Sequence, residues 1–219
     1  MLFDWSFALE ILPILAQAAV ITIEATLIGF VLALLLGLAL ALARMSRNPF
    51  ISFPAAGFIE FIRSTPLLIQ IFFLYFVFPK FGIVLPALVA GILALGLHYS
   101  TYCAEVYRAG LENVPRGQWE AATALNLAPM ATFRDIILPQ AIPPIIPALA
   151  NYLVALFKET PLLSAIAVLE LMQTAKIIGS DTFRYLEPIT LVGLFFLVMS
   201  LVSAALIRQG EAWLRRRRS

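Results

Sequence analysis

Charged side chains stand inside two apolar stretches of this chain, where they could bind a small charged solute. Arg63 lies in the first stretch, and the adjacent Lys158 and Glu159 lie in the second. A lysine can face a carboxylate and a glutamate can face a cationic nitrogen, while neighbouring hydroxyl and amide groups add neutral hydrogen bonds. Together these groups would suit a zwitterion. The candidate residues are Arg63, Ser64, Thr65, Asn151, Lys158, Glu159 and Thr160.

The same charges also have a structural interpretation. Arg63 lies one helical turn from Glu60, so the two could pair while the arginine reaches the membrane surface. Lys158 and Glu159 are adjacent and point ~100° apart on a helix, so they cannot neutralise each other along one face. Because a charge at the bilayer centre costs at least ~2.5–3.5 kcal/mol, we favour a role at the permeation path for this second pair.

His98, Tyr99 and Tyr102 could each be a structural residue at a helix interface or a contact of the solute. For His98, the only histidine, we expect the structural role, with a hydrogen bond at a helix interface. For Tyr99 and Tyr102 both roles stay open. The single cysteine, Cys103, excludes an internal disulfide and indicates no metal or redox site. We therefore expect neither a metal nor a cofactor.

A proline follows the charges in each apolar stretch. Arg63–Leu68 and Lys158–Leu163 both read as a cation, one residue, then Thr-Pro-Leu-Leu, near the middle of a predicted span. Each proline removes a helical hydrogen bond and displaces the carbonyl four residues back, at Ile62 and Phe157. Freed carbonyls at membrane depth are tolerated only beside a cavity or packed protein. Both spans are therefore predicted to be interrupted.

The composition predicts an all-α membrane protein. The chain has 219 residues, of which 62% are hydrophobic, and its mean hydropathy is +0.95. A hydrocarbon core of ~30 Å takes about 20 helical residues, and backbone polar groups in lipid must be bonded within their own segment. The five predicted transmembrane helices, forming a single domain over residues 1–219, are 17–43, 54–78, 85–103, 145–169 and 188–207.

Basic residues predict the orientation of these spans. With alternating loops, ten Lys or Arg fall on one face, from Arg44 to the tail Arg215–Arg218, and three fall on the other. The positive-inside rule then puts the N-terminus outside, with the C-terminus in the cytoplasm. We expect the tail to anchor the last span at the headgroups. Asp4 and Glu10, without a basic leading region, argue against a cleaved signal peptide.

The polar stretch 105–139 is predicted to be a cytoplasmic loop of two short helices. Pro115 suits a helix start, a helix follows over about 116–125, and Asn126 suits the left-handed residue after a helix end. A second helix would start at Pro129 and finish before Pro139. Small and apolar side chains on the loop fit helix-in-groove recognition by a partner, with packing on the chain's own helices as the alternative. Outside, the stretch 170–187 is expected to be a solvated loop.

Specific motifs in this loop resemble a known family. The segment Glu120-Ala121-Ala122, followed by Ile137-Leu138-Pro139, resembles the EAA loop of permease subunits from binding-protein-dependent ABC importers. Tyr107–Gly110, Val114–Ala122 and Phe61–Leu68 are similar to the polar-amino-acid branch of that family. The likeness covers about residues 15–215. One departure is Asn126, where the family has glycine, and we expect the turn to survive because asparagine tolerates the same backbone conformation.

The resemblance implies a type I ABC importer permease fold with cytoplasmic coupling helices, in the cell inner membrane. It implies as partners a cytoplasmic ABC ATPase dimer, a second permease subunit (the same or a different chain) and an extracytoplasmic solute-binding protein. The chain has no G-x-x-x-x-G-K-[ST] phosphate loop, so ATP hydrolysis would belong to another subunit. The implied ATPase-coupling residues are Gly117, Glu120, Ala121, Ala122, Leu125 and Asn126.

Within the branch, the tracts 84–100, 175–179 and 182–188 look most like ectoine and hydroxyectoine permease subunits. The expected solute is thus a small zwitterion, an amino acid or ectoine. A secondary transporter that works without an ATPase is the alternative, although it would not need a docking loop. A membrane enzyme would want a catalytic constellation such as H-E-x-x-H, which is absent from the sequence, and the charges inside the spans argue against a scaffold.

Overall fold

A computed structural model describes residues 3–216 of the chain, without the side chains of residue 206 and residues 211–216, and in this part the chain is helical with no strand. The long helices are α1 (Trp5–Arg44), α4 (Ala87–Glu112), α7 (Leu138–Glu159) and α9 (Leu186–Arg216). The shorter ones are α2 (Pro49–Arg63), α3 (Leu67–Phe72), α5 (Arg116–Ala124), α6 (Pro129–Ala131) and α8 (Leu171–Thr182). The predicted anchor Arg215–Arg218 lies outside the residues whose side chains are described.

Four helical segments of the described chain are long and apolar enough to cross a membrane, and a bent pair of helices makes a fifth candidate. This agrees with the predicted all-helical class and number of spans, although the helices extend further. The first begins at Trp5 instead of residue 17, because Asp4 caps it. The Asp4 carboxylate accepts hydrogen bonds from the backbone N–H groups of Ser6 and Phe7, which have no partner within the helix.

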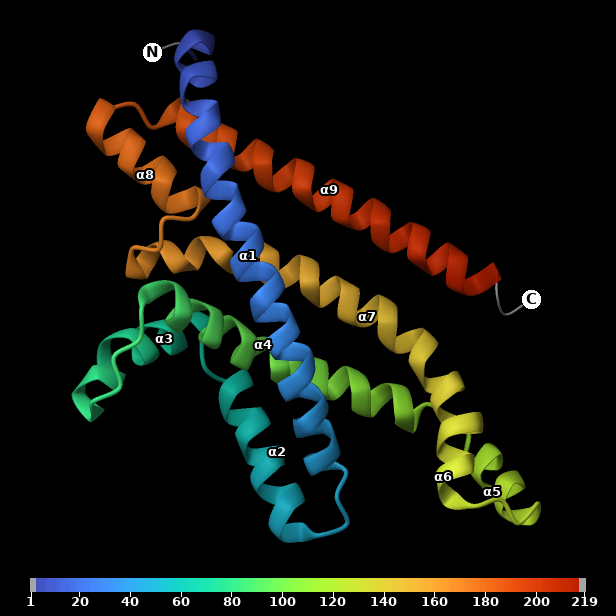
Figure 1. Cartoon of the computed structure of the whole chain (residues 1–219). Helices are drawn as coiled ribbons and strands as arrows, with labels where there is room; N and C mark the ends of the chain where they lie inside the picture. Colours follow the sequence, from blue (N-terminus) through green and yellow to red (C-terminus); the bar gives the residue numbers. More distant parts are fainter. Residues whose placement is uncertain (1–2, 217–219) are drawn as a thin grey trace.

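The start of α1 is tied to the start of α9, and Figure 1 shows these two helix ends close together. Arg184 Nη2 lies 3.2 Å from Asp4 Oδ2 and 2.8 Å from Glu187 Oε1. The backbone N–H of Asp4 also donates to Glu187 Oε1 at 3.1 Å. The Arg184 guanidinium lies over the Phe7 ring, 4.3 Å from its centroid. These contacts hold the first turn of α1 against the α8–α9 connection.

The second predicted span is broken into two helices. It begins at Pro49, after the Asn48 side chain caps α2, and it stops at Arg63. The chain then turns by 102° into α3, which continues through a π-helical turn (Phe73–Val77) and a 3-10 turn (Phe78–Phe81). The predicted interruption is confirmed, and the two helical parts cover Pro49–Arg63 and Leu67–Phe81, a longer stretch than the predicted 54–78. Proline at position 66 cannot continue α2, since it lacks the N–H that the next helical bond needs.

The helical segment of the fourth span begins within the polar stretch 105–139. We expected a helix from Pro129 to finish before Pro139, and this expectation is wrong. A π-helical turn (Thr132–Ile137) follows α6 and leads directly into α7. Pro139 falls in the first turn of α7, where a missing N–H is tolerated, and the wider π turn precedes it. The result is one helical segment from Pro129 to Ile166.

The charges predicted near the middle of the fourth span lie at the end of α7, where the helix changes to a tighter turn. Lys158 and Glu159 form its last turn, and a 3-10 turn (Thr160–Ile166) follows. Ala167 then adopts φ +59°, a left-handed conformation that ends the segment. The proline at position 161 explains the change, because it lies in the first turn of the tighter helix, where a proline is tolerated.

The stretch 170–187 is not the solvated loop that we expected. Residues 171–182 form α8, and the Glu170 carboxylate caps its start by accepting hydrogen bonds from Met172 N (2.9 Å) and Gln173 N (2.7 Å). Glu170 is fully buried at 0% exposure. Desolvation raises the pKa of this carboxyl, while the two N–H groups and Lys176 oppose the rise. The capping residue was overlooked because a Glu is a less usual helix cap than Ser, Thr, Asp or Asn.

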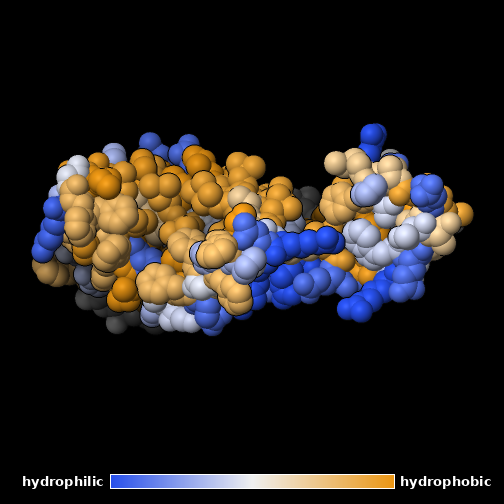
Figure 2. Space-filling view, turned by 90° about the horizontal axis from the view of Figure 1, so that it is seen from below, coloured by the Kyte–Doolittle hydropathy of each residue, from blue (hydrophilic) through white to orange (hydrophobic). Residues whose placement is uncertain are grey.

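The core lies mainly between α1 and α4, which cross each other in Figure 1 and are in extensive contact. Small residues allow the close approach: Ala25, Ala33 and Ala94 are all 0% exposed. A Cβ placed on Gly37 would lie 2.7 Å from the Cβ of Cys103. Figure 2 shows apolar surface over most of the bundle, and hydrophilic residues mix with apolar ones at the projecting end formed by α5 and α6.

Candidate functional site

The first candidate site is α5 and the turn behind it. The helix ends within one residue of the predicted boundary. Asn126 has φ +54°, so the left-handed turn expected at this position is confirmed. The backbone N–H of Leu127 donates to the Ala122 carbonyl at 3.0 Å, and that of Asn126 donates to the Thr123 carbonyl at 2.9 Å. These bonds satisfy the last carbonyls of α5 and fix the direction of the chain after it.

One side of α5 packs against the chain, and the other side is open. Ala122 is 1% exposed, whereas Leu125 is 72% exposed. Gly117, Glu120 and Ala121 are exposed as well, and a Cβ on Gly117 would meet no atom within 4 Å. Residues three or four apart share a helix face. Gly117, Glu120, Ala121 and Leu125 therefore form one outward surface, here called the α5 face, while Ala122 supports it from beneath.

Ionic contacts support the helix that leads into α5. Glu105 Oε1 lies 3.4 Å from Arg44 Nε on α1, and Glu105 Oε2 lies 2.7 Å from Arg108 Nη2. Arg108 also donates to Glu112 one turn further along. These residues belong to α4, so the first part of the predicted loop is helical. The network joins the C-terminal end of α1 to the last two turns before α5.

The second candidate site lies around the break between α2 and α3. The Arg63 guanidinium carbon is 5.1 Å from the centroid of the Tyr102 ring on α4, a cation–π arrangement. The structural interpretation of Arg63 as a partner of Glu60 is not supported. Among the described ion pairs there is none between them, and the hydroxyl of Ser64 donates to Glu60 Oε1 at 3.4 Å. Arg63 thus points across to α4.

Aromatic rings continue from Tyr102 to α7. The centroid of Tyr102 lies 5.3 Å from that of His98 and 5.5 Å from that of Tyr152, and Tyr152 lies 6.2 Å from Tyr99. Glu159 lies next to Tyr99. Its Oε2 is buried and has no hydrogen-bond partner among the described residues. We call this set the polar cluster, and its members are Arg63, His98, Tyr99, Tyr102, Tyr152 and Glu159.

The remaining residues of the predicted path on α7 lie elsewhere. Asn151 and Lys158 are both exposed and are seven residues apart, so they share one side of the helix. Tyr152 and Glu159 have the same spacing on the adjacent side, which meets α4. The structure therefore separates Lys158 from Glu159, as their ~100° offset requires. α7 presents one polar stripe to the cluster and a second stripe outward from this chain.

The threonine hydroxyls at the two breaks bind backbone carbonyls. Thr160 is fully buried and donates to the Phe157 carbonyl at 2.8 Å. Thr65 Oγ1 lies 3.2 Å from the Phe61 carbonyl and 3.1 Å from the Ile62 carbonyl. Ile62 and Phe157 carry the two carbonyls predicted to be freed by the prolines. Both threonines therefore stabilise the helix ends, which is a more local role than the predicted contact with a solute.

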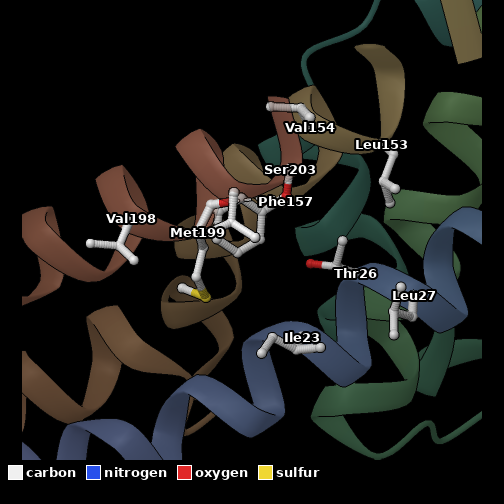
Figure 3. Close-up of a pocket in the computed structure, with 10 residues that line it drawn as sticks. Ile23, Thr26, Leu27, Leu153, Val154, Phe157, Val198, Met199 and Ser203 are labelled. Carbon is white, nitrogen blue, oxygen red and sulfur yellow. Dashed lines mark hydrogen bonds between the residues drawn. The ribbon is translucent and has the colours of Figure 1, made fainter. Parts of the chain in front are cut away.

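A cavity of about 280 Å³ between α1, α7 and α9 does not suit a polar solute. Figure 3 shows its apolar lining, which includes Ile23, Phe157 and Met199. Its two hydroxyl groups are already bonded, from Thr26 to the Thr22 carbonyl and from Ser203 to the Met199 carbonyl. Nothing in this lining would replace the water around a charge. The described residues also include no group of three His, Cys, Asp or Glu that could hold a metal ion.

Two members of the second site escaped the sequence analysis. Gln70, on α3, is 9% exposed and bonds across the break, and Tyr152 joins the rings of α4 to α7. A glutamine in an apolar run such as Leu67–Phe73 is a signal that could have been used, since a buried amide needs partners. Tyr152 could have been found from its spacing to Glu159. His98 is hydrogen-bonded and 8% exposed at a helix interface, as predicted.

Comparison with known proteins assigns the chain. Residues 29–216 match the family described as "Binding-protein-dependent transport system inner membrane component". The chain belongs to this family. It is therefore a multi-pass permease subunit of the inner membrane and has no catalytic activity of its own. Membership of this family accounts for both the long apolar helices and the motifs around α5.

Relatives of the permease cover nearly its whole length. It is 48% identical over 205 residues to the "Probable amino-acid ABC transporter permease protein y4tG" of Sinorhizobium fredii, covering 94% of this chain and 89% of that protein. It is 34% identical to the "L-cystine transport system permease protein TcyB" of Bacillus subtilis, covering 90% and 86%. The sequence likeness thus extends across all the predicted spans.

Solved structures share the fold of the permease. A chain of the "Crystal structure of an amino acid ABC transporter with histidines" superposes with a TM-score of 0.92 at 36% identity, covering 97% of this chain and 99% of that one. A chain of the inward-facing MetNI methionine ABC transporter superposes with a TM-score of 0.70 at 21% identity, covering 90% and 93%, which shows the fold alone. The predicted type I ABC permease fold is confirmed.

Proposed function

We propose that the permease is the membrane subunit of an ATP-driven importer for a small zwitterionic solute of the amino-acid class. Two permease subunits would enclose the solute path, and an ATPase dimer would bind their α5 faces in the cytoplasm. A solute-binding protein would deliver the solute from outside, where the N-terminus lies. The observation that carries the proposal is the α5 face, because an exposed helix flank with Leu125 72% open needs a partner surface.

The coupling role belongs to the residues of α5 and its turn. The α5 face (Gly117, Glu120, Ala121 and Leu125) would fill a groove of the ATPase, with Gly117 and Ala121 allowing close approach of the partner's backbone. Ala122 and Asn126 would hold α5 rigidly on the permease. The ionic network at Glu105 would pass the movement of α5 to α1, since it joins α4 to α1 directly.

The solute path would run beside the polar cluster. Lys158 would face the solute carboxylate, and Glu159 would face its cationic nitrogen, since its Oε2 is buried without a partner among the described residues. Arg63 and Ser64 would line the path on the side of the polar cluster, and Asn151 would line it on the outward stripe beside Lys158. Thr65 and Thr160 would stabilise the helix ends behind this lining. The outward stripe of Asn151 and Lys158 would meet the second permease subunit, so two copies together would complete the path.

The substrate class follows from the relatives and the charges. The relatives' names specify amino acids, and one specifies L-cystine. The motif likeness to ectoine and hydroxyectoine permeases adds ectoine as a candidate zwitterion. We propose uptake of an amino acid or ectoine and not of an anion or a sugar, because a lysine and a glutamate would both face the proposed path.

The proposal is tested by reconstituting the permease with its ATPase and binding protein in lipid vesicles. Uptake of labelled arginine, glutamine, cystine and ectoine would be measured with and without ATP. We expect ATP-dependent uptake of one of these zwitterions. Uptake that persists without any ATPase would overturn the proposal in favour of a secondary transporter.

Glu120→Lys tests the coupling surface. We expect the variant to insert normally and to lose stimulation of ATP hydrolysis by the loaded binding protein, because a cation replaces an anion on the α5 face. Asp135→Lys is the matched control, since it makes the same reversal of charge at an exposed carboxylate outside α5, in the π-helical turn Thr132–Ile137. Equal stimulation of ATP hydrolysis in both variants would contradict the assignment of this face.

Lys158→Ala tests the solute path. Because Lys158 has no ion pair among the described residues, its loss should leave folding and assembly unchanged. We expect uptake to fall by at least about tenfold, the effect of one lost charged hydrogen bond. Lys176→Ala on α8 is the control, being another exposed lysine. Normal uptake by correctly assembled Lys158→Ala would count against the site.

A further inference from the structure

The side-chain amide of Gln70 contacts both the break of the second span and a histidine on α4. Its Nε2 lies 2.8 Å from the Ile62 carbonyl, 3.1 Å from the Thr65 carbonyl and 2.8 Å from Thr65 Oγ1. All these partners belong to the end of α2 and the break, while Gln70 itself lies on α3. The amide therefore spans the bend of 102° between the two helices. Its Oε1 lies 3.3 Å from Nδ1 of His98 on α4.

These contacts determine which end of the amide is which. The Ile62 and Thr65 carbonyl oxygens can only accept hydrogen bonds, so the atom that meets them must be the NH₂ group of Gln70. The Thr65 hydroxyl is within bonding distance of the Phe61 and Ile62 carbonyls, and donation to one of them leaves its oxygen to accept from Gln70. The other end of the amide is thus Oε1, which can only accept.

This arrangement determines which ring nitrogen of His98 carries the proton. Because Oε1 of Gln70 cannot donate, Nδ1 of His98 must carry the hydrogen of the contact. In the neutral imidazole the other nitrogen, Nε2, is then the acceptor. No hydrogen bond among the described residues involves Nε2, whose ring lies beside Tyr99 and Tyr102. The carbonyls at the α2–α3 break thus set the tautomer of a residue on α4.

We infer that Gln70 is a positioning residue that fixes the break of the second span to α4 and holds His98 in the Nδ1–H tautomer. The same Tyr102 ring contacts His98 and Arg63, so the tie sets how the end of α2 meets the polar cluster. The Ile62 carbonyl, which lies four residues before Pro66, is one of the acceptors that orient the amide. The tautomer depends on geometry alone, whereas the effect on transport rests on the proposed function.

The single histidine makes a direct test possible. The permease would be produced with ¹⁵N-labelled histidine and assembled with its unlabelled ATPase in lipid nanodiscs, so that the chain contributes one kind of imidazole signal. Nitrogen NMR then shows which ring nitrogen carries the proton. We expect Nδ1–H with Nε2 unprotonated in the unmodified chain. A neutral ring protonated at Nε2 would overturn the inference without any variant.

Gln70→Leu provides the second measurement, with Gln17→Leu as the matched control. Gln17 is an exposed glutamine of α1, so its loss should change neither the tautomer nor transport. In Gln70→Leu we expect the Nε2–H tautomer to appear and uptake per ATP hydrolysed to fall about tenfold, because the Thr65 carbonyl and His98 Nδ1 both lose the partner that joins them. An unchanged tautomer or unchanged uptake in this variant would contradict the positioning role. If the unmodified chain shows Nδ1–H but the complex transports no zwitterion, the proposed function fails and the assignment of the tautomer stands.

Discussion

Asp4 sets the start of α1 through contacts that also shift its own titration. The Ser6 hydroxyl donates to its carboxylate at 2.6 Å, the Phe7 backbone N–H donates as well, and Arg184 lies 3.2 Å away. In that order these contacts lower the pKa of Asp4 from 3.8 to about 2. Because the folded pKa is below the ordinary value, ionised Asp4 stabilises the fold fully above pH 3.8 and loses this effect as the pH falls through about 2.

This linkage predicts a pH dependence confined to the start of α1. We expect protection of the Phe7 and Ala8 amides against hydrogen exchange to be constant above pH 3.8 and to fall as the pH approaches 2. Asp4→Asn should remove the pH dependence, whereas Asp181→Asn, at an exposed site, should keep it. A pH dependence that survives Asp4→Asn would show that another group is responsible.

The α1–α4 pair depends on glycines that differ in how tightly they are enclosed. A Cβ on Gly37 would lie 2.7 Å from Cys103 Cβ and 2.8 Å from the Ser100 carbonyl oxygen, and neither atom can move without shifting a helix. A Cβ on Gly29 would meet its nearest neighbour, Leu95 Cβ, at 3.5 Å, which is ordinary contact. Only the first of these glycines is required by packing.

Alanine substitutions at the two glycines should therefore differ in their effect on the free energy of unfolding. Gly37→Ala is expected to lower the free energy of unfolding by about 1–3 kcal/mol through overpacking. Gly29→Ala should be neutral or stabilising, since alanine favours a helix over glycine by roughly 0.5–1 kcal/mol. Melting temperatures of the purified complex in nanodiscs would separate the two. Equal melting temperatures for both variants would contradict the close approach at Gly37.

The proposed orientation concerns the whole molecule, and the structure offers sites for testing it. Ser180 is exposed on α8, and Thr123 is exposed on α5 at the opposite end of the bundle (Figure 1). The native Cys103 is buried at 0% exposure, where burial prevents reaction with polar reagents. Single added cysteines can therefore be labelled without removing the native one.

Accessibility in intact cells should distinguish the two ends. We expect a membrane-impermeant thiol reagent to label Ser180→Cys from outside, and to label Thr123→Cys only after the inner membrane is permeabilised. The unmodified chain, with Cys103 alone, should stay unlabelled in both conditions. Labelling of Thr123→Cys in intact cells would invert the proposed topology and remove α5 from reach of a cytoplasmic ATPase.

Local features of the chain were determined by the sequence itself. The helical class follows from composition, because apolar runs in lipid must bond their own backbone. The break at Pro66 and the left-handed Asn126 follow from the properties of single residues, and both are observed. The boundaries of α5 could be predicted for the same reason, since proline and asparagine act within a few residues of their own position.

Only the tertiary structure decided which of these residues meet. Gln70, His98 and Tyr152 come from three helices, and no local pattern relates their positions. Ala122 faces inward, and Lys158 and Glu159 lie on different stripes of α7. Both arrangements depend on what packs against each helix. Periodicity describes one helix at a time, whereas the polar cluster exists because the bend after α2 and the length of α4 bring distant segments together.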